Sequence, residues 1–486
     1  MTSTGLGQRG QAAASVTARR RVVARALVKQ SFVLAIVPAL PAAAAAAEGE
    51  IVLSVALAAP AALLAALGLI ARRIEIDADL RRIEAVVTLS LVFLCSAVAI
   101  LPGFIVLGMP PLDGFFEGVS GITTTGLSVA RGTEDWPWSG HFLRAWTQWC
   151  GGVVVAVAGV ALLMGAGRAA RVMGQQSVGD LGYVASTRVQ ARVILIGYSA
   201  LTAIGIAGCL ILLPGFEGPL VALAAVSTGG FTPRPTSLAE YALAGQVFTM
   251  ALCVAGAVSL LFYAQALRRG PRVALREGTV PVTLALIFGG AAIFAAADIV
   301  LLGWDPARLV PGVLNFVSAQ TTAGFSAAPV LSAGAPVILL ILAMVLGGDV
   351  GSTTGGIKAA RTITLAKMIA LVFLRLRLPD RAVTHVRIGG KRAEVDQLIL
   401  ATALLGIYLI SALVFWLALM AGGYEPLVAL FDAVSALSGV GLSTGVIGPD
   451  LPAALKALTI GAMMLGRLEF FAFIVLFLPS TWISRR

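Results

Sequence analysis

The chain has 486 residues, of which 58% are hydrophobic and only 12% are charged, and its formal net charge is +11. Soluble globular domains carry about 25% charged residues, so this composition excludes a soluble protein and indicates one that crosses a membrane many times. A strongly basic soluble chain would suggest a nucleic-acid partner, but here the positive charge is sorted between loops. Membrane orientation explains that sorting better, and we expect no nucleic acid as a partner.

The N-terminal region precedes the repeated part of the chain. Residues 1–30 are polar and basic, and the apolar stretch at 31–47 is short and interrupted by Pro38 and Pro41. Its alanine run resembles a signal-peptide cleavage sequence. Because a full span follows at once at 51–71, two N-terminal spans are the simpler interpretation. The segment 1–82 is therefore predicted to hold a basic segment and two extra transmembrane helices.

Four similar units follow, predicted at 83–172, 188–270, 278–378 and 394–486. Each contains an apolar span, a half-length helix, an extended stretch and a second span. The first spans are predicted at 84–107, 193–213, 280–303 and 397–420, and the half-length helices at 112–122, 219–226, 310–320 and 426–437. The second spans are predicted at 142–165, 241–267, 336–373 and 455–478. A half-length helix is too short to cross a bilayer, so we expect it to enter the membrane and return.

The half-length helix of each unit is followed by four residues that end in glycine, and Leu or Phe comes next. These sixteen residues are Thr123, Thr124, Thr125, Gly126, Ser227, Thr228, Gly229, Gly230, Thr321, Thr322, Ala323, Gly324, Ser438, Gly439, Val440 and Gly441. A single small-residue segment is more often a contact between helices. Four such segments at one place in a repeat favour a ring in which backbone carbonyl oxygens replace the water shell of an alkali cation.

Charge placement predicts the orientation. Most Lys and Arg residues fall on the side of the N-terminus, and five fall on the other side: Arg131, Arg144, Arg234, Arg308 and Lys456. By the positive-inside rule both termini are cytoplasmic and the glycine-ended segments lie in the outer half. Acidic residues there are expected either to attract cations to a mouth or to be ordinary solvated charges. They include Asp113, Glu117, Glu217 and Asp432.

The second span of the third unit contains five glycines in the twelve residues 347–358. Glycine destabilises a helix by about 1 kcal/mol relative to alanine, so the helix should break here. The residues concerned are Gly347, Gly348, Asp349, Gly351, Gly355, Gly356 and Lys358. The segment does not match the phosphate-binding loop pattern. We expect a mobile gate, and a plain kink is the alternative.

Arg467 lies in the middle of the predicted span 455–478. An arginine at the bilayer centre costs roughly 2.5–3.5 kcal/mol on insertion scales, so it usually faces a partner or a water-filled path. Glu469, two residues further on, points to another side of a helix. Asp349 or backbone carbonyls of segment 347–356 are the expected partners, and a purely structural ion pair is the alternative.

These features together resemble the Trk/Ktr/HKT potassium transporter superfamily. The resemblance is carried by the four glycine-ended segments, by Gly355-Gly356-Ile357-Lys358, by Gly466-Arg467-Leu468-Glu469 and by the sequence from Trp146 to Gly152. The two extra N-terminal spans favour the bacterial TrkH-type ion-translocating subunit. The resemblance implies an all-α polytopic fold with four pseudo-repeated units around a central pore.

The resemblance also implies a function. K⁺ would be the transported ion, the four glycine-ended segments would form the selectivity filter, and the Gly-rich segment with Arg467 would obstruct the pore. Glycine at 126, 230, 324 and 441 goes with potassium preference in the family. The implied assembly is a homodimer in the bacterial inner membrane with a cytosolic nucleotide-binding regulatory subunit of the TrkA or KtrA type. The sequence departs from the family pattern at Asp349 and at Gly439-Val440, where no hydroxyl occurs.

Three alternative functions are less well supported by the sequence. Transport of Na⁺ or of mixed monovalent cations would use the same fold. A secondary transporter with discontinuous helices needs inverted repeats, whereas these units have two full spans each and are parallel. An enzyme that pairs Asp349 with Asp432 would need residues from opposite halves of the membrane. We therefore expect neither an enzyme nor an organic cofactor, and whether transport is channel-like or coupled to H⁺ or Na⁺, as in a symporter, stays open.

Overall fold

The computed structural model describes residues 17–73, 80–165, 187–277, 279–330, 334–379, 384, 386–388, 391–393 and 395–483. Part of the predicted cytoplasmic charge, at 1–16, 166–186 and 484–486, lies outside the described residues. Within them the chain is helical apart from one antiparallel hairpin, β1 (Arg387–Ile388) and β2 (Lys391–Arg392). This confirms the predicted all-helical membrane fold.

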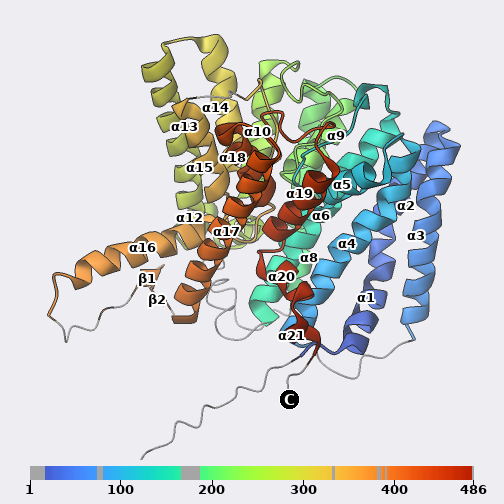
Figure 1. Ribbon diagram of the computed structural model, residues 1–486, viewed down its shortest axis with the longest axis horizontal. Coiled ribbons are helices and arrows are strands. Elements are labelled where there is room, and N and C mark those ends of the chain that lie inside the picture. The colour runs from blue at the N-terminus through green and yellow to red at the C-terminus, as the bar shows by residue number, and fades with distance from the viewer. Residues whose placement is uncertain are drawn as a thin grey trace, which may run out of the picture.

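The N-terminal region forms three helices, α1 (Arg20–Leu34), α2 (Ile36–Glu48) and α3 (Ile51–Ala71). α1 and α2 form one apolar span of 29 residues, so the first span begins earlier than the predicted residue 31. Gly49 turns the chain at φ 92°, and α3 returns against both helices. Figure 1 shows these blue helices at one side of the molecule, next to α4.

The remaining helices fall into four units in chain order. Unit one contains α4 (Arg82–Val106), α5 (Pro111–Ile122), the short 3-10 helix η1 (Thr133–Asp135) and α6 (Trp138–Gly165). Unit two contains α8 (Thr187–Leu212), α9 (Glu217–Val226), α10 (Leu243–Ala257), α11 (Leu260–Arg269) and α12 (Pro271–Glu277). Unit three contains α13 (Val280–Leu302), α14 (Pro306–Gln320), α15 (Ala335–Leu346) and α16 (Ala359–Arg375). Unit four contains α17 (Val395–Ala421), α18 (Pro426–Ser438), α19 (Ala453–Arg467), α20 (Phe471–Phe477) and α21 (Pro479–Trp482).

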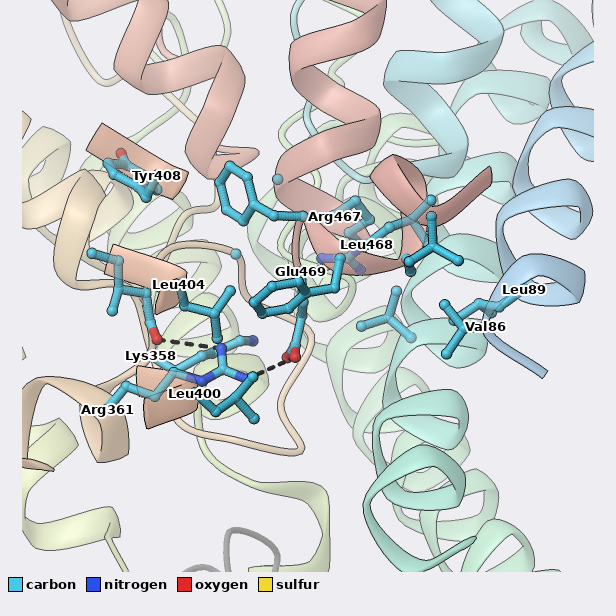
Figure 2. Close-up of a pocket in the computed structure, with 18 of the residues that line it drawn as sticks. Val86, Leu89, Lys358, Arg361, Leu400, Leu404, Tyr408, Arg467, Leu468 and Glu469 are labelled. Atoms are coloured by element: carbon cyan, nitrogen blue, oxygen red, sulfur yellow. Dashed lines mark hydrogen bonds and ion pairs between the residues drawn. The ribbon is translucent and has the colours of Figure 1, made fainter. Parts of the chain in front are cut away.

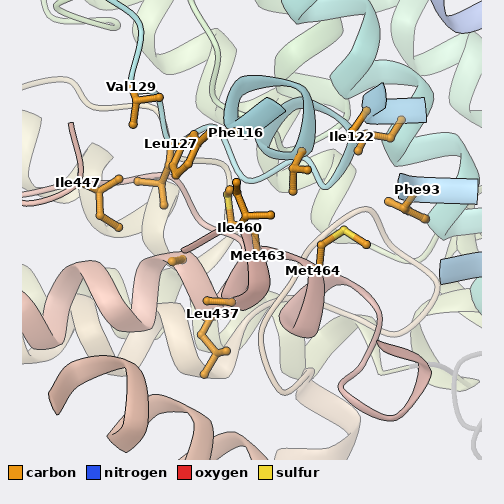
Figure 3. Packing of buried hydrophobic residues seen from close by; sticks show 14 of the residues in the cluster. Phe93, Phe116, Ile122, Leu127, Val129, Leu437, Ile447, Ile460, Met463 and Met464 are labelled. Carbon is orange, nitrogen blue, oxygen red and sulfur yellow. The ribbon is translucent and has the colours of Figure 1, made fainter. Parts of the chain in front are cut away.

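The units contact one another in a ring. The second long helix of each unit packs on the half-length helix of the next: α6 on α9, α10 on α14, α15 on α18, and α19 back on α5. Between units four and one this contact is an apolar core that includes Phe116, Leu437, Met463 and Met464, all buried (Figure 3). The half-length helices are therefore held at the centre of the molecule.

The break predicted in the third unit is confirmed, because α15 ends at Leu346 and α16 begins at Ala359. Two further breaks, which the sequence did not predict, interrupt the spans expected at 241–267 and 455–478. α10 and α11 are bent by 83° between Ala257 and Leu260. α19 ends at Arg467, and Glu469 and Phe470 follow with φ of 53° and 62°. Each break has only a single glycine beside it, Gly256 and Gly466, and no proline, whereas the segment 347–358 contains five glycines.

Six helices of the described chain are long and apolar enough to cross a membrane, or seven if the bent pair α10–α11 counts as one span. Large apolar side chains such as Ile211 and Val300 are more than 80% exposed on their outer faces, as expected for contact with lipid. Both ends of the described chain lie together, where the Ala18 amide donates to the Thr481 carbonyl (2.8 Å). We call this the inner end of the molecule.

Candidate functional site

All four half-length helices end in the same backbone turn. The second residue of each glycine-ended segment is left-handed, with φ of 52° at Thr124, 51° at Thr228, 50° at Thr322 and 62° at Gly439. The amide of the third residue donates to a carbonyl five residues earlier, for example from Thr125 to Ser120 (2.9 Å). This is a Schellman motif, which normally has glycine at the left-handed position. Glycine at 439 therefore supplies without strain the conformation that a threonine adopts in the other three units.

The final glycines of the four segments surround one centre. A Cβ at Gly126 would collide with the carbonyl oxygen of Gly229, and one at Gly230 with that of Ala323. Likewise, a Cβ at Gly324 would collide with the carbonyl oxygen of Val440, and one at Gly441 with that of Thr125. Their φ values are 86°, 83°, 76° and 101° in chain order. Each glycine thus allows the carbonyl of the next unit to approach, and the fourth unit closes the ring on the first.

The first residue of each segment directs its hydroxyl away from this ring. Thr123, Ser227 and Thr321 donate to carbonyls one turn back in their own helices, at 2.7, 2.9 and 2.7 Å. The Ser438 hydroxyl bonds instead to the Tyr408 hydroxyl (2.7 Å). Each hydroxyl is therefore occupied in binding its own or a neighbouring helix.

Sequence reasoning missed that three polar residues occupy the same position of the repeat behind the ring, two of them having been assigned to the outer mouth. Glu117, Asn315 and Asp432 each lie six residues before the first residue of their segment. Glu117 accepts from the Ser128 hydroxyl (3.0 Å), and Asn315 accepts from the Ala327 amide (2.7 Å). All three therefore hold in place the residues that follow the final glycine of their unit. Their common position, six residues before each glycine-ended segment, is the sequence signal that could have identified them.

Asp432 is the most heavily bonded of the three. It accepts from the Ser443 hydroxyl (2.6 Å), from the Thr444 amide and hydroxyl (2.8 and 3.0 Å) and from the Ile447 amide (2.9 Å). Its side chain is fully buried. The carboxylate is thus the common acceptor for the chain that follows Gly441.

Unit two has Val221 at the equivalent position, and a neighbouring unit replaces the missing polar group. Gln148 on α6 accepts from the Phe231 amide (3.1 Å) and donates to the Gly229 carbonyl. It is fully buried. Every segment is therefore fixed from behind by a buried carboxylate or amide, three times from its own unit and once from the preceding one.

Of the eight acidic residues expected at an outer mouth, four are buried or half-buried, whereas Glu134, Asp135, Asp305 and Glu425 are exposed. Glu117 is fully buried and pairs with Arg144 (2.9 Å), and Asp113 pairs with Lys456 (2.7 Å). Glu217 at the start of α9 pairs with Arg234 in the loop after Gly230 (3.0 Å). Burial has the largest single effect on the pKa of Arg234 and lowers it, but the hydrogen bond to Glu217 and the charges of Glu217, Tyr241 and Glu240 together outweigh burial, so the pKa is raised. Asp432 is likewise buried, so Asp113, Glu117, Glu217 and Asp432 are not free solvated charges.

The Gly-rich segment 347–357 lies directly against the inner ends of three of the four glycine-ended segments. The Gly355 amide donates to the Thr322 hydroxyl (2.8 Å), and the Gly356 amide donates to the Ser438 carbonyl (3.1 Å). The Thr228 hydroxyl donates to that of Thr353 (3.2 Å). The equivalent Thr124 hydroxyl has no hydrogen-bond partner within the described part of the chain.

The segment is folded back on itself and fits into the break of α10. The Ile357 amide donates to the Val345 carbonyl (2.9 Å), which brings the two ends of the segment together. The Asp349 amide donates to the Ala257 carbonyl (3.0 Å) and the Thr353 amide to the Gly256 carbonyl (3.2 Å). Helix carbonyls left open by the 83° bend are therefore satisfied by the Gly-rich segment.

Glycine is required at five positions of this segment for different local reasons. Gly347, Gly351 and Gly356 have φ of 64°, 78° and 70°, which favour glycine. At Gly355 a Cβ would collide with the Ser438 carbonyl, and at Gly348 it would press on the Thr354 side chain. The Lys358 ammonium bonds to the Thr354 carbonyl within the same loop.

Arg467 is buried and donates to the Thr353 carbonyl (2.7 Å). Of the two partners expected for it, the structure therefore shows a loop carbonyl. Asp349 accepts instead from the Thr279 hydroxyl and from the Val350 amide (2.7 Å). Glu469 pairs with Arg361 (2.7 Å). Asp349 and Asp432 have no bonding partner in common.

The fold and this site define a multi-pass membrane protein whose four units bring half-length helices and a ring of backbone carbonyls to one centre. The family model described as "TrkH: Cation transport protein" matches residues 100–269 and 304–486. The chain belongs to this family.

Individual relatives agree. The Trk system potassium uptake protein TrkH of Halomonas elongata is 30% identical over 77% of this chain and 80% of its own length. An uncharacterized cation transporter of Methanocaldococcus jannaschii is 27% identical over 75% of this chain and 76% of its own length. The crystal structure of the potassium transporter TrkH from Vibrio parahaemolyticus has the same fold, with a TM-score of 0.82 at 21% identity over 96% of this chain and 100% of that one.

Proposed function

We propose that this protein takes up potassium by passing K⁺ through the ring of glycine-ended segments. The observation that carries the proposal is the cyclic approach of each final glycine to a carbonyl of the next unit, from Gly126 round to Gly441. Such carbonyls replace the hydration shell of a permeating cation. The name of the Halomonas elongata relative, a potassium uptake protein, supports K⁺ as the ion.

The Gly-rich segment is the proposed gate. It is bonded to the inner ends of units two, three and four, so a permeating ion would meet it after leaving the ring. Arg467 holds it through the Thr353 carbonyl and adds a positive charge that repels cations. Opening then requires these hydrogen bonds to break.

We further infer the setting in which the protein works. The relatives' name, Trk system, supports a partner such as a cytosolic nucleotide-binding subunit of the TrkA or KtrA type. Placement in the bacterial inner membrane with both termini cytoplasmic fits the charge distribution of the sequence. A homodimer is the assembly that the family resemblance implies. On this orientation the inner end of the molecule faces the cytoplasm.

Cation flux into liposomes tests the proposed function. The purified protein is reconstituted, and uptake of radiolabelled Rb⁺ is competed with K⁺, Na⁺ and Cs⁺, with and without a pH gradient. We expect K⁺ to compete strongly and Na⁺ weakly. Equal competition by Na⁺ would favour a mixed cation transporter, and uptake only with a pH gradient would indicate coupling to protons. Absence of any monovalent cation uptake by folded protein would contradict the proposal.

A further inference from the structure

A cavity of about 650 Å³ lies on the inner side of the Gly-rich segment. Its walls come from α4, α17 and the broken region between α19 and α20, and Gly355 and Gly356 form part of its lining. Figure 2 shows Val86 and Leu89 of α4 on one side of it and Lys358 and Arg361 on the other. The gate segment therefore faces directly into this space.

The cavity is strongly basic. Five cationic side chains and one carboxylate line it: Arg81, Arg82, Lys358, Arg361, Arg467 and Glu469. Arg361 and Arg467 are only 6% and 5% exposed. The Nε of Arg361 and the Nε and Nη2 of Arg467 nevertheless have no hydrogen-bond partner among the described residues. Buried guanidinium groups with free N–H donors indicate a missing acceptor, and an anion is the acceptor that the charge favours.

The rest of the lining is apolar. It is contributed mainly by aliphatic side chains of three helices: Ile83, Val86, Leu89, Leu400, Leu404 and Val475. α17 and α20 also present apolar side chains outward, such as Ile399 (61% exposed) and Phe477 (66% exposed). The cavity therefore combines an anion-binding end with an apolar wall, and its helices border the bilayer.

We propose that this cavity binds an anionic phospholipid, with the headgroup phosphate on the free N–H groups of Arg361 and Arg467 and acyl chain against the aliphatic wall. Arginine suits phosphate because its planar guanidinium donates two parallel hydrogen bonds. Basic pockets between transmembrane helices are a known setting for lipid headgroups. The charge and the apolar wall together favour a lipid over a soluble anion.

Occupancy would favour the closed gate. Gly355 and Gly356 line the cavity, so movement of the segment away from the ring carries it into this space. A lipid that fills the space opposes that movement. This consequence rests on the proposed function, whereas the binding site itself does not.

Lipid retention tests the site. The full-length protein is exchanged into detergent with phosphatidylglycerol or phosphatidylcholine, and bound lipid is measured by native mass spectrometry. We expect preferential retention of phosphatidylglycerol, about tenfold weaker in Arg361→Gln and several-fold stronger in Glu469→Gln. Arg268→Gln removes an exposed arginine from the end of α11, outside the cavity, and should leave retention unchanged.

The two cavity variants are expected to change lipid retention in opposite directions, which separates loss of binding from structural damage. Both cavity variants break the same Arg361–Glu469 ion pair, so mere structural damage would shift both in one direction. Equal retention of the two lipids, equal effects of Arg361→Gln and Arg268→Gln, or stabilisation by inorganic phosphate without retention of phosphatidylglycerol would each overturn the lipid site.

Rb⁺ uptake into liposomes tests the effect of the lipid on the gate. Rb⁺ uptake by the wild-type protein should fall as phosphatidylglycerol replaces phosphatidylcholine in the liposomes, and Arg361→Gln should be less sensitive. Uptake that rises or stays constant would overturn the gating role. Specific lipid retention without any cation uptake would support the site and count against the proposed function, so the two failures are distinguishable.

Discussion

Three threonines stand in a backbone conformation that their branched side chains disfavour. Thr124, Thr228 and Thr322 have φ near 50°, and each such residue costs of order 1–3 kcal/mol. The turn is held by the Schellman hydrogen bonds and, in two units, by contact with the Gly-rich segment. Because this backbone strain recurs at the same position in three units, we infer that the hydroxyl and the carbonyl of these threonines serve the ring.

The final glycines give the first prediction. In Gly126→Ser, the new Cβ meets the Gly229 carbonyl, so the ring must widen and should hold a dehydrated K⁺ less well. We expect the preference for Rb⁺ and K⁺ over Na⁺ to fall several-fold in liposome flux. Gly289→Ser on α13 is the matched control, because a Cβ there would meet nothing within 4 Å beyond its own helix backbone. Unchanged selectivity in a folded Gly126→Ser protein would contradict the filter assignment.

The second prediction concerns Asp432, the buried carboxylate behind the glycine-ended segment of unit four. Asp432→Ala leaves two hydroxyls and two amides without their acceptor and should lower the free energy of unfolding by roughly 2–4 kcal/mol. Selectivity should weaken as well, because the chain after Gly441 is no longer held. Thermal unfolding and flux measure the two effects. Asp135→Ala, at an exposed position, should change neither, and equal stability of the two variants would refute the bracing role.

At the scale of elements, the second long helix is broken in units two, three and four, whereas α6 runs from Trp138 to Gly165. The three breaks meet at one place. The Gly-rich segment between α15 and α16 bonds to the carbonyl end of α10, and Arg467 at the end of α19 bonds to the same segment. The breaks therefore form one hydrogen-bonded assembly beneath the ring.

Removing the contact from α19 should loosen this assembly. A hydrogen bond from a charged donor contributes about 1.5–3 kcal/mol, so Arg467→Ala should shift a closed gate toward opening about tenfold or more. We expect higher basal Rb⁺ uptake, as we also expect for a deletion within 347–357. Arg268→Ala serves as the control of equal charge change. Reduced uptake by a folded Arg467→Ala protein would be incompatible with this gate.

The whole molecule is a ring closed by contacts between its first and last units. α19 packs on α5, and Lys456 bridges to Asp113 at 2.7 Å with both side chains largely buried. Residues 343 positions apart are thereby joined at the outer half. Closure matters because the carbonyl of Thr125 and the backbone of Gly441 must meet to complete the ring.

A charge swap tests this closure. Lys456→Asp should leave two carboxylates facing each other and lower the free energy of unfolding by roughly 1–3 kcal/mol. The double variant Lys456→Asp with Asp113→Lys restores opposite charges and should recover much of the loss in thermal unfolding. Additive destabilisation in the double variant would mean that the pair does not contribute to closure.

The sequence by itself determined the membrane class, the break at 347–358 and the four positions where glycine ends a half-length helix. These follow from local composition, from helix propensity and from repetition, which are visible without coordinates. Only the tertiary structure decided that α10 and α19 are also broken, because their open carbonyls and Arg467 find partners about a hundred residues away. It likewise decided that Glu117 and Asp432 are buried braces and that Gln148 serves a neighbouring unit. The sequence records only the residue type, which is the same for a charged or polar side chain in a solvated mouth and for one buried behind the ring. Only the packing around the side chain distinguishes the two environments.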